Sequence, residues 1–443
     1  MKINLPENVE LIIRKLNEAG HEAYAVGGCI RDVILGRVPN DWDITTSAVP
    51  CEIKKVFRRT FDTGIKHGTI SVLLYKDIYE ITTYRIDGEY LDCRHPSQVL
   101  FSRSLKDDLK RRDFTMNALA YNDADGLIDL FNGLKDIDDK VIRAVGNPYE
   151  RFTEDALRIL RGIRFSSQLG FTIDEETKEG MKGLAPNLKR ISAERIQEEL
   201  VKLLVSDRPD TLRMAYKLGV TKVILPEFDK MMETTQETIH HDRSVGEHTI
   251  KAMLNIRADK VLRLTMLCHD MGKPALKTFD KEGVAHFKKH SKESFEMTKV
   301  ILRRLKFDND TYNKVTKLVY YHDYRMEADK KHVRRAINKI GKDLFPLYIE
   351  VRRADALSQS EFMREEKLED IDNIERLFYE ILSANEAVTI KDLAINGKDL
   401  INMGVEQGTK IGEILSYLLE LVLNDPELND KEKLQDIVKE KYM

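Results

Sequence analysis

The sequence is poor in cysteine, with only four among its 443 residues. These four cysteines are far apart and form no Cys-x-x-Cys pair. This spacing argues against both a disulfide framework and a zinc knuckle. The sequence also has no apolar run close to the ~18 residues that a membrane span requires, and its amphipathic N-terminus has no signal-peptide core. We therefore expect a cytoplasmic protein without a membrane partner.

The sequence also has no large excess of charge of one sign. It contains 72 lysines and arginines and 75 aspartates and glutamates, which gives a net charge of −3. This balance excludes a uniformly basic nucleic-acid-binding surface, although it allows a local basic groove. Hydrophobic residues make up 42% of the chain, which is enough for buried cores. At roughly 100–200 residues per domain, the length predicts about three domains.

Strand signals are concentrated in the N-terminal part of the chain. Residues 7–19 have a helical apolar period, and residues 21–26 predict a short strand. The β-branched stretch 61–86 alternates, which predicts two strands joined at Lys76-Asp77. The polar residues 87–104 predict a mobile loop.

From residue 105 onward the apolar period is helical, with strand signals only around 127–145. No fixed-period repeat or low-complexity tract interrupts this order. Strands first and helices afterwards predict an α+β protein, with a small mixed-sheet head followed by a long all-α part.

The strand at 21–26 leads into a glycine pair, Gly27-Gly28, which is followed by Arg31. Glycine lets the backbone approach a phosphate because no Cβ intervenes, and an arginine can bind phosphate oxygens in bidentate fashion. Asp41 and Asp43 come next, and on a strand their side chains would point to one face. Two adjacent carboxylates suit Mg²⁺, although an isolated Asp-x-Asp is usually a turn cap or a surface pair.

Glu80 lies on the second strand predicted within 61–86. If that strand runs beside the two aspartates, Glu80 completes a set of three carboxylates for a two-metal site. The alternative is a glutamate that simply faces solvent.

A basic run, Lys110-Arg111-Arg112, precedes Asp113 and Asn117. The three cations suit a triphosphate, and the two polar residues are candidate partners for a ribose or for the arginines. Taken alone, such a run is usually a solvated helix face.

Asp155, Arg158, Arg161 and Arg164 recur at intervals of three residues. On one helix they would lie along one side of it, each displaced by about 60° from the one before, because three residues turn about 300°. Asp155 and Arg158 alone are compatible with a stabilising ion pair worth a few tenths of a kcal/mol. Three arginines on one stripe favour an anionic ligand instead.

Candidate metal ligands are spread over the later helical part, at His248, His269, Asp270, His290, His322 and Asp355. Neutral imidazoles combined with carboxylates suit a transition metal such as Mn²⁺, Fe, Ni²⁺ or Zn²⁺. The competing explanation is that these histidines only cap and pack helices.

Four motifs follow one another as Gly-Gly-x-x-Arg-Asp (27–32), Asp-x-Asp (41–43), Arg-Arg-Asp-Phe-Thr-x-Asn-Ala (111–118) and Glu-Asp-x-x-Arg-x-x-Arg (154–161). In this order they resemble the bacterial-type (class II) tRNA nucleotidyltransferases, the CCA-adding enzymes. Further segments of that family match at 63–69, 192–196 and 393–400. The resemblance therefore covers essentially the whole chain.

The resemblance implies a polymerase-beta-like nucleotidyltransferase head, neck and body helices, an HD domain and tRNA-binding tail helices, at residues 1–130, 131–230, 231–360 and 361–443. It implies that Asp41 and Asp43 hold Mg²⁺ in catalysis. Glu80, which the strand pattern and not the resemblance indicates, is the candidate third carboxylate. The residues that the resemblance implies for nucleotide binding are Gly28, Arg31, Arg112, Asp155, Arg158, Arg161 and Arg164.

The order His…His-Asp…Asp in the later part resembles the HD phosphohydrolase superfamily. This resemblance implies transition-metal ligands at His248, His269, Asp270 and Asp355. The two remaining histidines, His290 and His322, are then candidates for a second metal. Phosphate monoesters or 2′,3′-cyclic phosphates are the substrates that the resemblance implies.

The base-reading pair that the family resemblance implies, Asp155 and Arg158, agrees with hydrogen-bond chemistry. Cytosine and adenine each present an amino donor beside a ring-nitrogen acceptor, which a carboxylate and a guanidinium complement. Uracil and guanine present a carbonyl oxygen and an N–H instead. One such pair accepts CTP and ATP and rejects UTP and GTP with no nucleic-acid template.

We therefore expect template-independent addition of C, C and A to the 3′ end of tRNA from CTP and ATP, together with an HD phosphohydrolase activity. The loop at 87–104 resembles the family's flexible loop that helps to switch from C to A addition. An enzyme that adds only A has nearly the same motifs and stays an alternative. A bacterial poly(A) polymerase shares the head but lacks the HD domain and tail, and an alarmone synthetase/hydrolase has its two domains in the reverse order.

Overall fold

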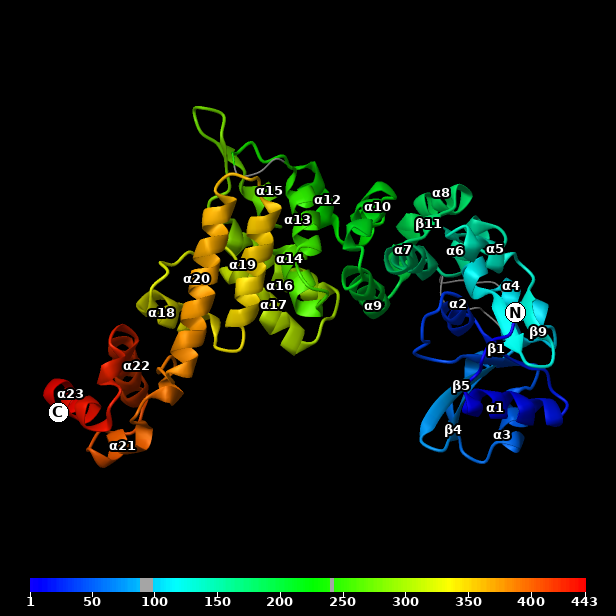
Figure 1. The fold of residues 1–443 in the computed structure, drawn as a ribbon, viewed down its shortest axis with the longest axis horizontal. Helices are drawn as coiled ribbons and strands as arrows, with labels where there is room; N and C mark the ends of the chain where they lie inside the picture. Colours follow the sequence, from blue (N-terminus) through cyan, green and yellow to red (C-terminus); the bar gives the residue numbers. More distant parts are fainter. Residues whose placement is uncertain (88–98, 240–242) are drawn as a thin grey trace. The chain divides into compact units, whose positions relative to one another are not determined.

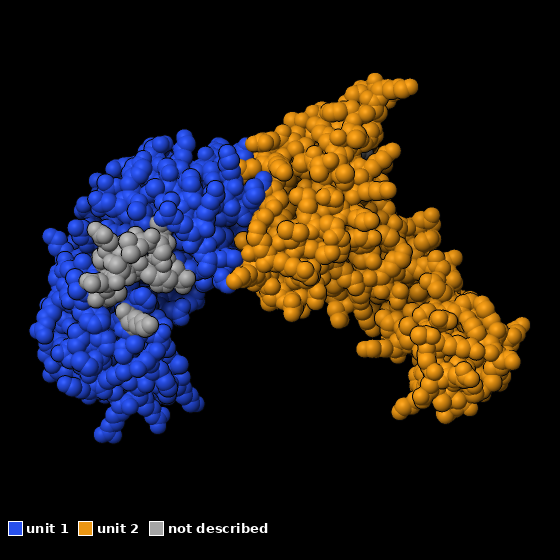
Figure 2. All heavy atoms as spheres, turned by 180° about the vertical axis from the view of Figure 1, so that it is seen from behind, with its two compact units in different colours: residues 1–226 blue, residues 227–443 orange. Residues whose placement is uncertain are grey.

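The computed structural model describes residues 1–87, 99–239 and 243–443 (Figure 1). The chain forms two compact units, residues 1–226 and 227–443, which Figure 2 shows in two colours. The division lies close to the predicted boundary at 230.

Unit 1 contains a seven-stranded mixed sheet (Figure 1). In spatial order its strands are β3 (Thr60–Gly64), β4 (Thr69–Leu74), β5 (Asp77–Thr83), β2 (Ile44–Thr46), β1 (Ala23–Val26), β8 (Leu119–Asn122) and β9 (Gly126–Asp129). β1 is antiparallel to both β2 and β8, whereas β2 is parallel to β5. Every residue of β1, β2 and β8 is buried, as is expected for strands in the interior of a sheet. The head thus has the mixed sheet that the sequence predicts.

Strand β8 corrects the prediction that residues 105–126 are helical. Leu119–Asn122 instead pair with β1 on one side and with β9 on the other. A short apolar run has no period that distinguishes a buried strand from a helix. The position of these residues beside β1 decides their conformation.

The helices of unit 1 are α1 (Glu7–Glu18), α2 (Gly28–Ile34), α3 (Pro50–Val56), α4 (Leu105–Lys110), α5 (Gly133–Asp138), α6 (Pro148–Glu154), α7 (Leu157–Leu169), α8 (Glu175–Leu184), α9 (Ala193–Leu204), α10 (Leu212–Lys217) and α11 (Thr221–Ile224). After the sheet, α7 packs against α9 and α6 packs against α8. A two-stranded parallel pair, β10 (Val141–Ile142) and β11 (Thr172–Ile173), lies within the part after the sheet.

Part of the loop predicted at 87–104 is a strand. β7 (Val99–Phe101) pairs antiparallel with β6 (Arg85–Asp87), and Ser104 caps the N-terminus of α4. Residues 88–98, which hold the centre of the candidate switching loop, lie outside the described residues.

Unit 2 is mainly helical, as predicted. Its helices are α12 (Pro226–Glu233), α13 (Val245–Leu254), α14 (Lys260–Cys268), α15 (Lys273–Leu276), α16 (His290–Arg304), α17 (Asn309–Tyr321), α18 (Lys330–Ile340), α19 (Phe345–Ser358), α20 (Arg364–Ser383), α21 (Gly397–Asn402), α22 (Thr409–Asn424) and α23 (Lys431–Tyr442). A small hairpin, β12 (Thr278–Phe279) and β13 (Ala285–His286), follows α15.

One hydrophobic core of unit 2 runs from Leu318 to Val438 and includes the stacked rings of Phe345 and Phe378. It therefore continues across the predicted boundary at 360. Among the described residues, no helix combines the length and apolar character that crossing a bilayer needs.

Candidate functional site

The glycine pair joins β1 to α2 and brings the predicted triphosphate-binding residues together. Gly27 has a φ of +90°, where glycine is favoured, and a Cβ there would lie 2.8 Å from Nη1 of Arg112. Gly28 is the first residue of α2, and a Cβ on it would lie 3.6 Å from Nη2 of Arg31. Gly28, Arg31 and Arg112 therefore meet at this turn, and the positive φ of Gly27 explains the first of the two glycines.

Both arginines at this turn are held by polar partners. Arg31 is buried and donates a 2.6 Å hydrogen bond to the side-chain oxygen of Asn117. Arg112 lies 3.3 Å from the carboxylate of the fully buried Asp108, which also accepts two hydrogen bonds from Arg111. Burial alone would raise the pKa of the Asp108 carboxyl, but Arg111 and Arg112 hold that pKa below its usual range. Asp108 was not predicted from the sequence as a site residue.

Asp41 and Asp43 lie in the connection immediately before β2, so the predicted strand does not include them. Desolvation raises the pKa of the Asp43 carboxyl, Arg112 and Arg161 oppose that rise, and Asp41 adds to it. A cation bound at the Asp43 carboxylate would oppose both of these effects. The pair therefore fits the predicted Mg²⁺, whose preferred ligands are oxygens.

Glu80 lies on β5, whose parallel register places Ile81 beside Ile44 of β2. The residues preceding this pair are Glu80 and Asp43, so the two carboxylates come from neighbouring chain segments. Within the described part of the chain, Asp41, Asp43 and Glu80 do not bring oxygens within 4.8 Å of one another as a set of three. The role of Glu80 as a third metal ligand stays a prediction.

Asp113 and Asn117 connect the phosphate-binding turn to α7. Asn117 donates to Asp113 at 3.0 Å, and Asp113 accepts a 2.8 Å hydrogen bond from Arg161. Because Asn117 also accepts from Arg31, a continuous chain of hydrogen bonds joins Arg31 to Arg161. Burial alone would raise the pKa of the Asp113 carboxyl, but Arg161 and Asn117 hold it well below its usual range. Asp113 and Asn117 are thus partners of the arginines, which is one of the two roles considered from the sequence.

Asp155 does not share a helix with the arginines that follow it. Helix α6 ends at Glu154 and α7 begins at Leu157, and Asp155 accepts a 3.0 Å hydrogen bond from the backbone N–H of Leu157. The prediction of a single four-residue stripe is therefore wrong for Asp155. A carboxylate before a helix can satisfy its free N–H groups, and this capping interaction replaces a helical position.

Asp155 and Arg158 have separate partners. The guanidinium of Arg195, on α9, donates to both oxygens of Asp155 at 2.7 and 3.3 Å. Arg158 is buried and donates to Glu154 at 2.6 Å and to two backbone carbonyl oxygens. The ion pair between Asp155 and Arg158 that the spacing allows is replaced by these contacts. Arg195 belongs to the family segment at 192–196, but no sequence pattern indicates that it reaches Asp155.

The two remaining arginines of α7 share a buried counter-ion that sequence reasoning did not find. Glu199 of α9 bonds Arg164 at 2.5 Å and lies 3.9 Å from Arg161. The guanidinium carbons of Arg31, Arg161 and Arg164 lie 4.9, 5.4 and 3.9 Å from the ring centre of Phe165. Such cation–π contacts hold three like charges around one ring.

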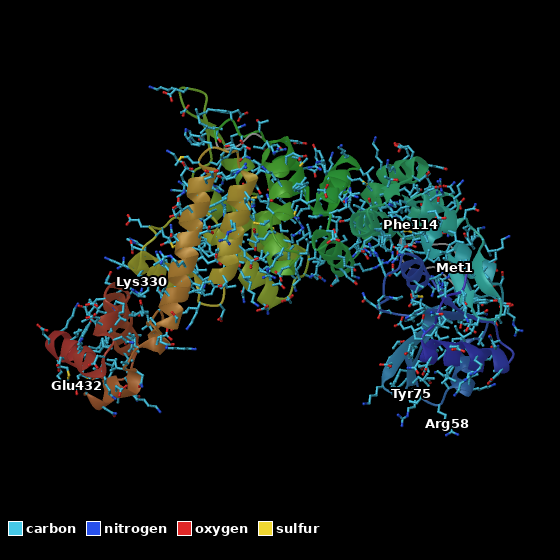
Figure 3. The ribbon with its side chains drawn as sticks, in the orientation of Figure 1. Met1, Arg58, Tyr75, Phe114, Lys330 and Glu432 are labelled. Carbon is cyan, nitrogen blue, oxygen red and sulfur yellow. The ribbon has the colours of Figure 1, made fainter. Side chains whose placement is uncertain are left out.

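A recess of about 570 Å³ in unit 1 lies away from these residues. Arg58 and Tyr75 line it, and both are labelled near one end of the sheet in Figure 3. None of the predicted site residues lines this recess. The glycine turn and α7, rather than this recess, are therefore the candidate nucleotide site.

In unit 2 the four predicted histidines form two pairs, and within each pair the Nε2 atoms face one another. The Nε2 atoms of His248 and His269 are 3.3 Å apart, and those of His290 and His322 are 3.1 Å apart. Each Nδ1 faces a backbone carbonyl oxygen, which can only accept, so Nδ1 carries the proton. Two Nε2 lone pairs at such distances repel unless a cation lies between them. This arrangement is the one that metal-binding histidines adopt.

Two carboxylates complete these histidine pairs. Oδ1 of Asp355 lies 2.9 Å from Nε2 of His248. Asp270 turns Oδ2 toward His269 at 3.2 Å and Oδ1 toward His290 at 3.4 Å. Two groups of ligand atoms lie within 4.8 Å of one another: His248 with His269 and Asp355, and Asp270 with His290 and His322. The donor set of imidazoles and carboxylates fits a transition metal, which either group of three residues would hold.

Two further residues contact the carboxylates and were not predicted from the sequence. The buried ammonium group of Lys273 lies 2.8 Å from Oδ2 of Asp270. Nε2 of Gln359 donates a 3.0 Å hydrogen bond to Oδ2 of Asp355. Such contacts orient metal-ligating side chains.

Three protein families match parts of the chain. The poly A polymerase head domain matches residues 23–143, and the RNA and SrmB-binding site of polymerase A matches residues 170–232. The tRNA nucleotidyltransferase domain 2 matches residues 285–438.

Curated relatives and a solved structure extend this similarity along the chain. The CCA-adding enzyme of Enterococcus faecalis is 54% identical over 194 residues, which are 44% of this chain and 48% of the relative, so this match spans about half of its length. The CCA-adding enzyme of Streptococcus pyogenes serotype M4 is 36% identical over 97% of this chain and 95% of its own. The crystal structure of the Bacillus stearothermophilus CCA-adding enzyme in complex with CTP is 28% identical, with a TM-score of 0.75 over 99% of this chain and 98% of that one.

Proposed function

The chain belongs to the family of the CCA-adding enzymes, and we propose that it adds C, C and A to the 3′ end of tRNA from CTP and ATP without a template. One observation carries this proposal: a single hydrogen-bonded chain, from Arg31 to Arg161, connects the phosphate-binding turn to the helix that follows Asp155. An enzyme that selects a nucleotide without a template needs its phosphate site and its base site in one fixed frame.

In this mechanism Asp41 and Asp43 hold Mg²⁺, which when bound orients the tRNA 3′ hydroxyl and neutralises the departing pyrophosphate. The 3′ hydroxyl gives up its proton to solvent water, its oxygen forms a bond to the α-phosphorus, and the bond from that phosphorus to pyrophosphate breaks. Arg31 and Arg112 bind the phosphate oxygens of the incoming nucleotide. Because buried partners fix both guanidinium groups, the nucleotide enters a site that is already arranged.

Asp155 and Arg158 read the base in this proposal. The carboxylate of Asp155 accepts from the amino group of cytosine or adenine, and the guanidinium of Arg158 donates to the adjacent ring nitrogen. Arg161 and Arg164 support the site through their shared contact with Glu199. Uracil and guanine would place an acceptor against Asp155 and a donor against Arg158, at a cost of about 1–3 kcal/mol for each unmade bond.

The test offers CTP and ATP, separately and together, to tRNAs that end before C, after C, after CC and after CCA. Full CCA addition predicts that only the mixture completes a tRNA lacking all three nucleotides. Addition to the CC-ending tRNA alone would identify an A-adding enzyme. Continued addition of A after CCA would identify a poly(A) polymerase.

We infer that unit 2 has a second activity, as a metal-dependent phosphohydrolase. The observation that favours it is the pairing of four Nε2 atoms with Asp270 and Asp355 in two adjacent groups. The residues that would hold the metals are His248, His269, Asp270, His290, His322 and Asp355. A transition metal bound there would supply a water nucleophile near neutral pH.

The double variant His269→Ala/Asp270→Ala tests this second activity in the full chain. We expect it to lose bound Mn²⁺ and hydrolysis of phosphate monoesters or 2′,3′-cyclic phosphates, while CCA addition remains. Asp41→Ala is the matched reverse variant, since it should lose CCA addition and keep hydrolysis. Wild-type protein that binds no transition metal and hydrolyses none of these substrates with Mn²⁺ or Ni²⁺ would refute the activity.

A further inference from the structure

The recess of about 570 Å³ in unit 1 is formed by α1, by α3 with the residues that follow it, and by β4 (Figure 1). α1 packs against α3, and α3 packs against β4, so these elements are held together. The lining consists of five apolar residues, three cations and one tyrosine. A volume of this size is typical of a site for a small molecule.

The three cations of the lining belong to Lys15, Arg58 and Arg59. Within the described part of the chain, none of the three side chains forms an ion pair or a hydrogen bond. The acidic residues that follow them in the sequence have other partners, because Glu18 lies 3.9 Å from Arg14 and Asp62 lies 2.7 Å from Lys54. No carboxylate lines the recess. The protein therefore leaves the positive charge of the recess without a counter-ion.

The charge and chemistry of this lining suit a ligand with several phosphates. Cations that line one recess add their fields and attract an anion, and arginine matches the geometry of phosphate oxygens. One phosphate group carries a charge of about −1.5 to −2, so three cations suit two or three linked phosphates. The lining contains no acidic side chain, imidazole or thiol, and thus offers neither the usual side-chain ligands of a metal nor a strong nucleophile. We therefore expect binding without Mg²⁺ and without reaction.

Tyr75 is the aromatic member of the lining. Leu74 of β4 pairs with Asp77 of β5, so Tyr75 lies in the tight turn between the two strands. Its φ is +56°, a conformation that is uncommon for a bulky residue, and it is 75% exposed. Figure 3 labels Tyr75 and Arg58 at the same end of unit 1. The turn thus places an exposed aromatic ring beside the cations, where a base can stack on it.

We propose that this recess binds a polyphosphate group and is separate from the nucleotide site at the glycine turn. Lys15, Arg58 and Arg59 bind the phosphate oxygens. The group belongs either to a nucleoside triphosphate or to an inorganic polyphosphate, since both present the same linked phosphates. The inference does not depend on CCA addition or on the phosphohydrolase activity, because none of the residues assigned to those sites lines the recess.

The test titrates the full chain with inorganic tripolyphosphate and with ATP by calorimetry, in the absence of Mg²⁺. Trp42, the one tryptophan of the chain, lies between Asp41 and Asp43, so its fluorescence reports occupation of the catalytic site. In the wild type we expect a binding event that leaves this fluorescence unchanged. In Arg58→Gln and in Arg59→Gln the Kd of that event should rise about 10-fold, the equivalent of one charge-assisted hydrogen bond.

Arg14→Gln and Lys55→Gln are the matched controls, because each removes one exposed cation from α1 or α3 that does not line the recess. They should change the Kd by less than about twofold. CCA addition should be the same in these controls, in Arg58→Gln and in Arg59→Gln. Thermal unfolding of each variant identifies any that loses binding only because it is misfolded.

Tyr75→Ala separates the two sources of the polyphosphate group. If ATP binds more tightly than tripolyphosphate and Tyr75→Ala removes the difference, the ligand is a nucleotide. Equal binding of the two compounds in the wild type, lost in Arg58→Gln, identifies inorganic polyphosphate.

Three results would overturn the proposal. The first is a wild type in which every binding event changes the fluorescence of Trp42. The second is an equal loss of affinity in Arg14→Gln and Arg58→Gln, which would show a general effect of charge. The third is binding of single-stranded RNA, lost in Arg58→Gln, with no binding of tripolyphosphate, which would make the recess an RNA contact.

Discussion

Arg195 and Asp155, forty residues apart in the chain, form a two-point ion pair with N–O distances of 2.7 and 3.3 Å. The same carboxylate accepts from the backbone N–H of Leu157 at the start of α7. Arg195 lies in the first turn of α9, so the pair joins the beginnings of two helices. The orientation of the predicted base-reading carboxylate is therefore set by a residue outside the motif that contains it.

Arg195→Gln should weaken nucleotide selection. Without the guanidinium, Asp155 keeps only its bond to the helix, and its plane is no longer fixed. We expect the preference for CTP and ATP over UTP and GTP to fall about 10-fold, the equivalent of one charged hydrogen bond. The measurement is kcat/KM for each of the four nucleotides with a tRNA that ends in C.

Lys202→Ala, on the same helix, is the control for this variant because its ion pair with Glu198 is exposed. It should leave all four kcat/KM values unchanged. A variant Arg195→Gln with lower activity but intact selection would show that Arg195 only stabilises the fold.

Asp41→Ala and Asp43→Ala should each reduce nucleotide addition at least about 10²-fold, because each removes half of the carboxylate pair that fits Mg²⁺. Binding of tRNA should change little, since phosphate contacts dominate the affinity for nucleic acid. Addition is measured with labelled ATP, and binding by gel shift. Asp62→Ala removes an exposed carboxylate paired with Lys54 and serves as the control. Either variant with more than a tenth of wild-type addition would contradict the metal assignment.

Asp113→Asn should destabilise unit 1 at neutral pH and not in acid. The folded-state pKa of Asp113 lies well below the unfolded value of about 3.9, because Arg161 and Asn117 favour the charged form. The resulting stability is fully present above the unfolded pKa and is lost as pH falls through the folded pKa. The difference in free energy of unfolding between wild type and variant, about 1–3 kcal/mol at pH 7, should thus shrink below about pH 4.

Urea unfolding of both proteins at several pH values measures this difference, and groups that the two proteins share cancel from it. Asp138→Asn is a suitable control, since Asp138 is exposed at the end of α5. A difference that stays constant from pH 7 to pH 3 would mean that Asp113 does not act through its charge.

Gln359→Leu should weaken the binding of Mn²⁺ to unit 2 about 10- to 100-fold, as expected when a residue that orients a metal ligand is removed. The amide of Gln359 is bonded to Asp355 at 3.0 Å, so its loss frees that carboxylate to rotate. The measurement is a calorimetric titration of metal-free protein. Gln168→Leu, in unit 1, removes an amide of the same size far along the chain and should not alter this binding. An unchanged Mn²⁺ affinity in Gln359→Leu would show that Asp355 is held by its other contacts.

The sequence could predict those parts of the sites that lie within short motifs. The motifs predict that Gly28, Arg31 and Arg112 bind one phosphate group, and the strand-to-helix turn at the glycine pair brings these residues together. The mixed-sheet head and the helical remainder also follow from the order of periodic segments.

The contacts that complete the sites could not be predicted in this way, because they join segments far apart in the chain. Nothing in the spacing of Glu199 or Arg195 indicates which arginine or carboxylate it meets, since that depends on how α7 packs against α9. The interval between Asp155 and Arg158 fits a helical period, so the sequence predicts that both residues lie on one helix. Asp155 instead precedes α7 and accepts a capping hydrogen bond from the backbone N–H of Leu157.

The position of β8 has a consequence for synthesis of the protein. β1 lies between β2 and β8, and Ala25 pairs with Tyr121. Strand β8 pairs with the second edge of β1, and the ribosome synthesises it only after β2, β3 to β5 and α4. Until then the nascent chain exposes an unpaired, apolar strand edge, which is prone to association with other chains. Fragments that end before Leu119 should aggregate, and chaperones that bind nascent chains should engage this segment.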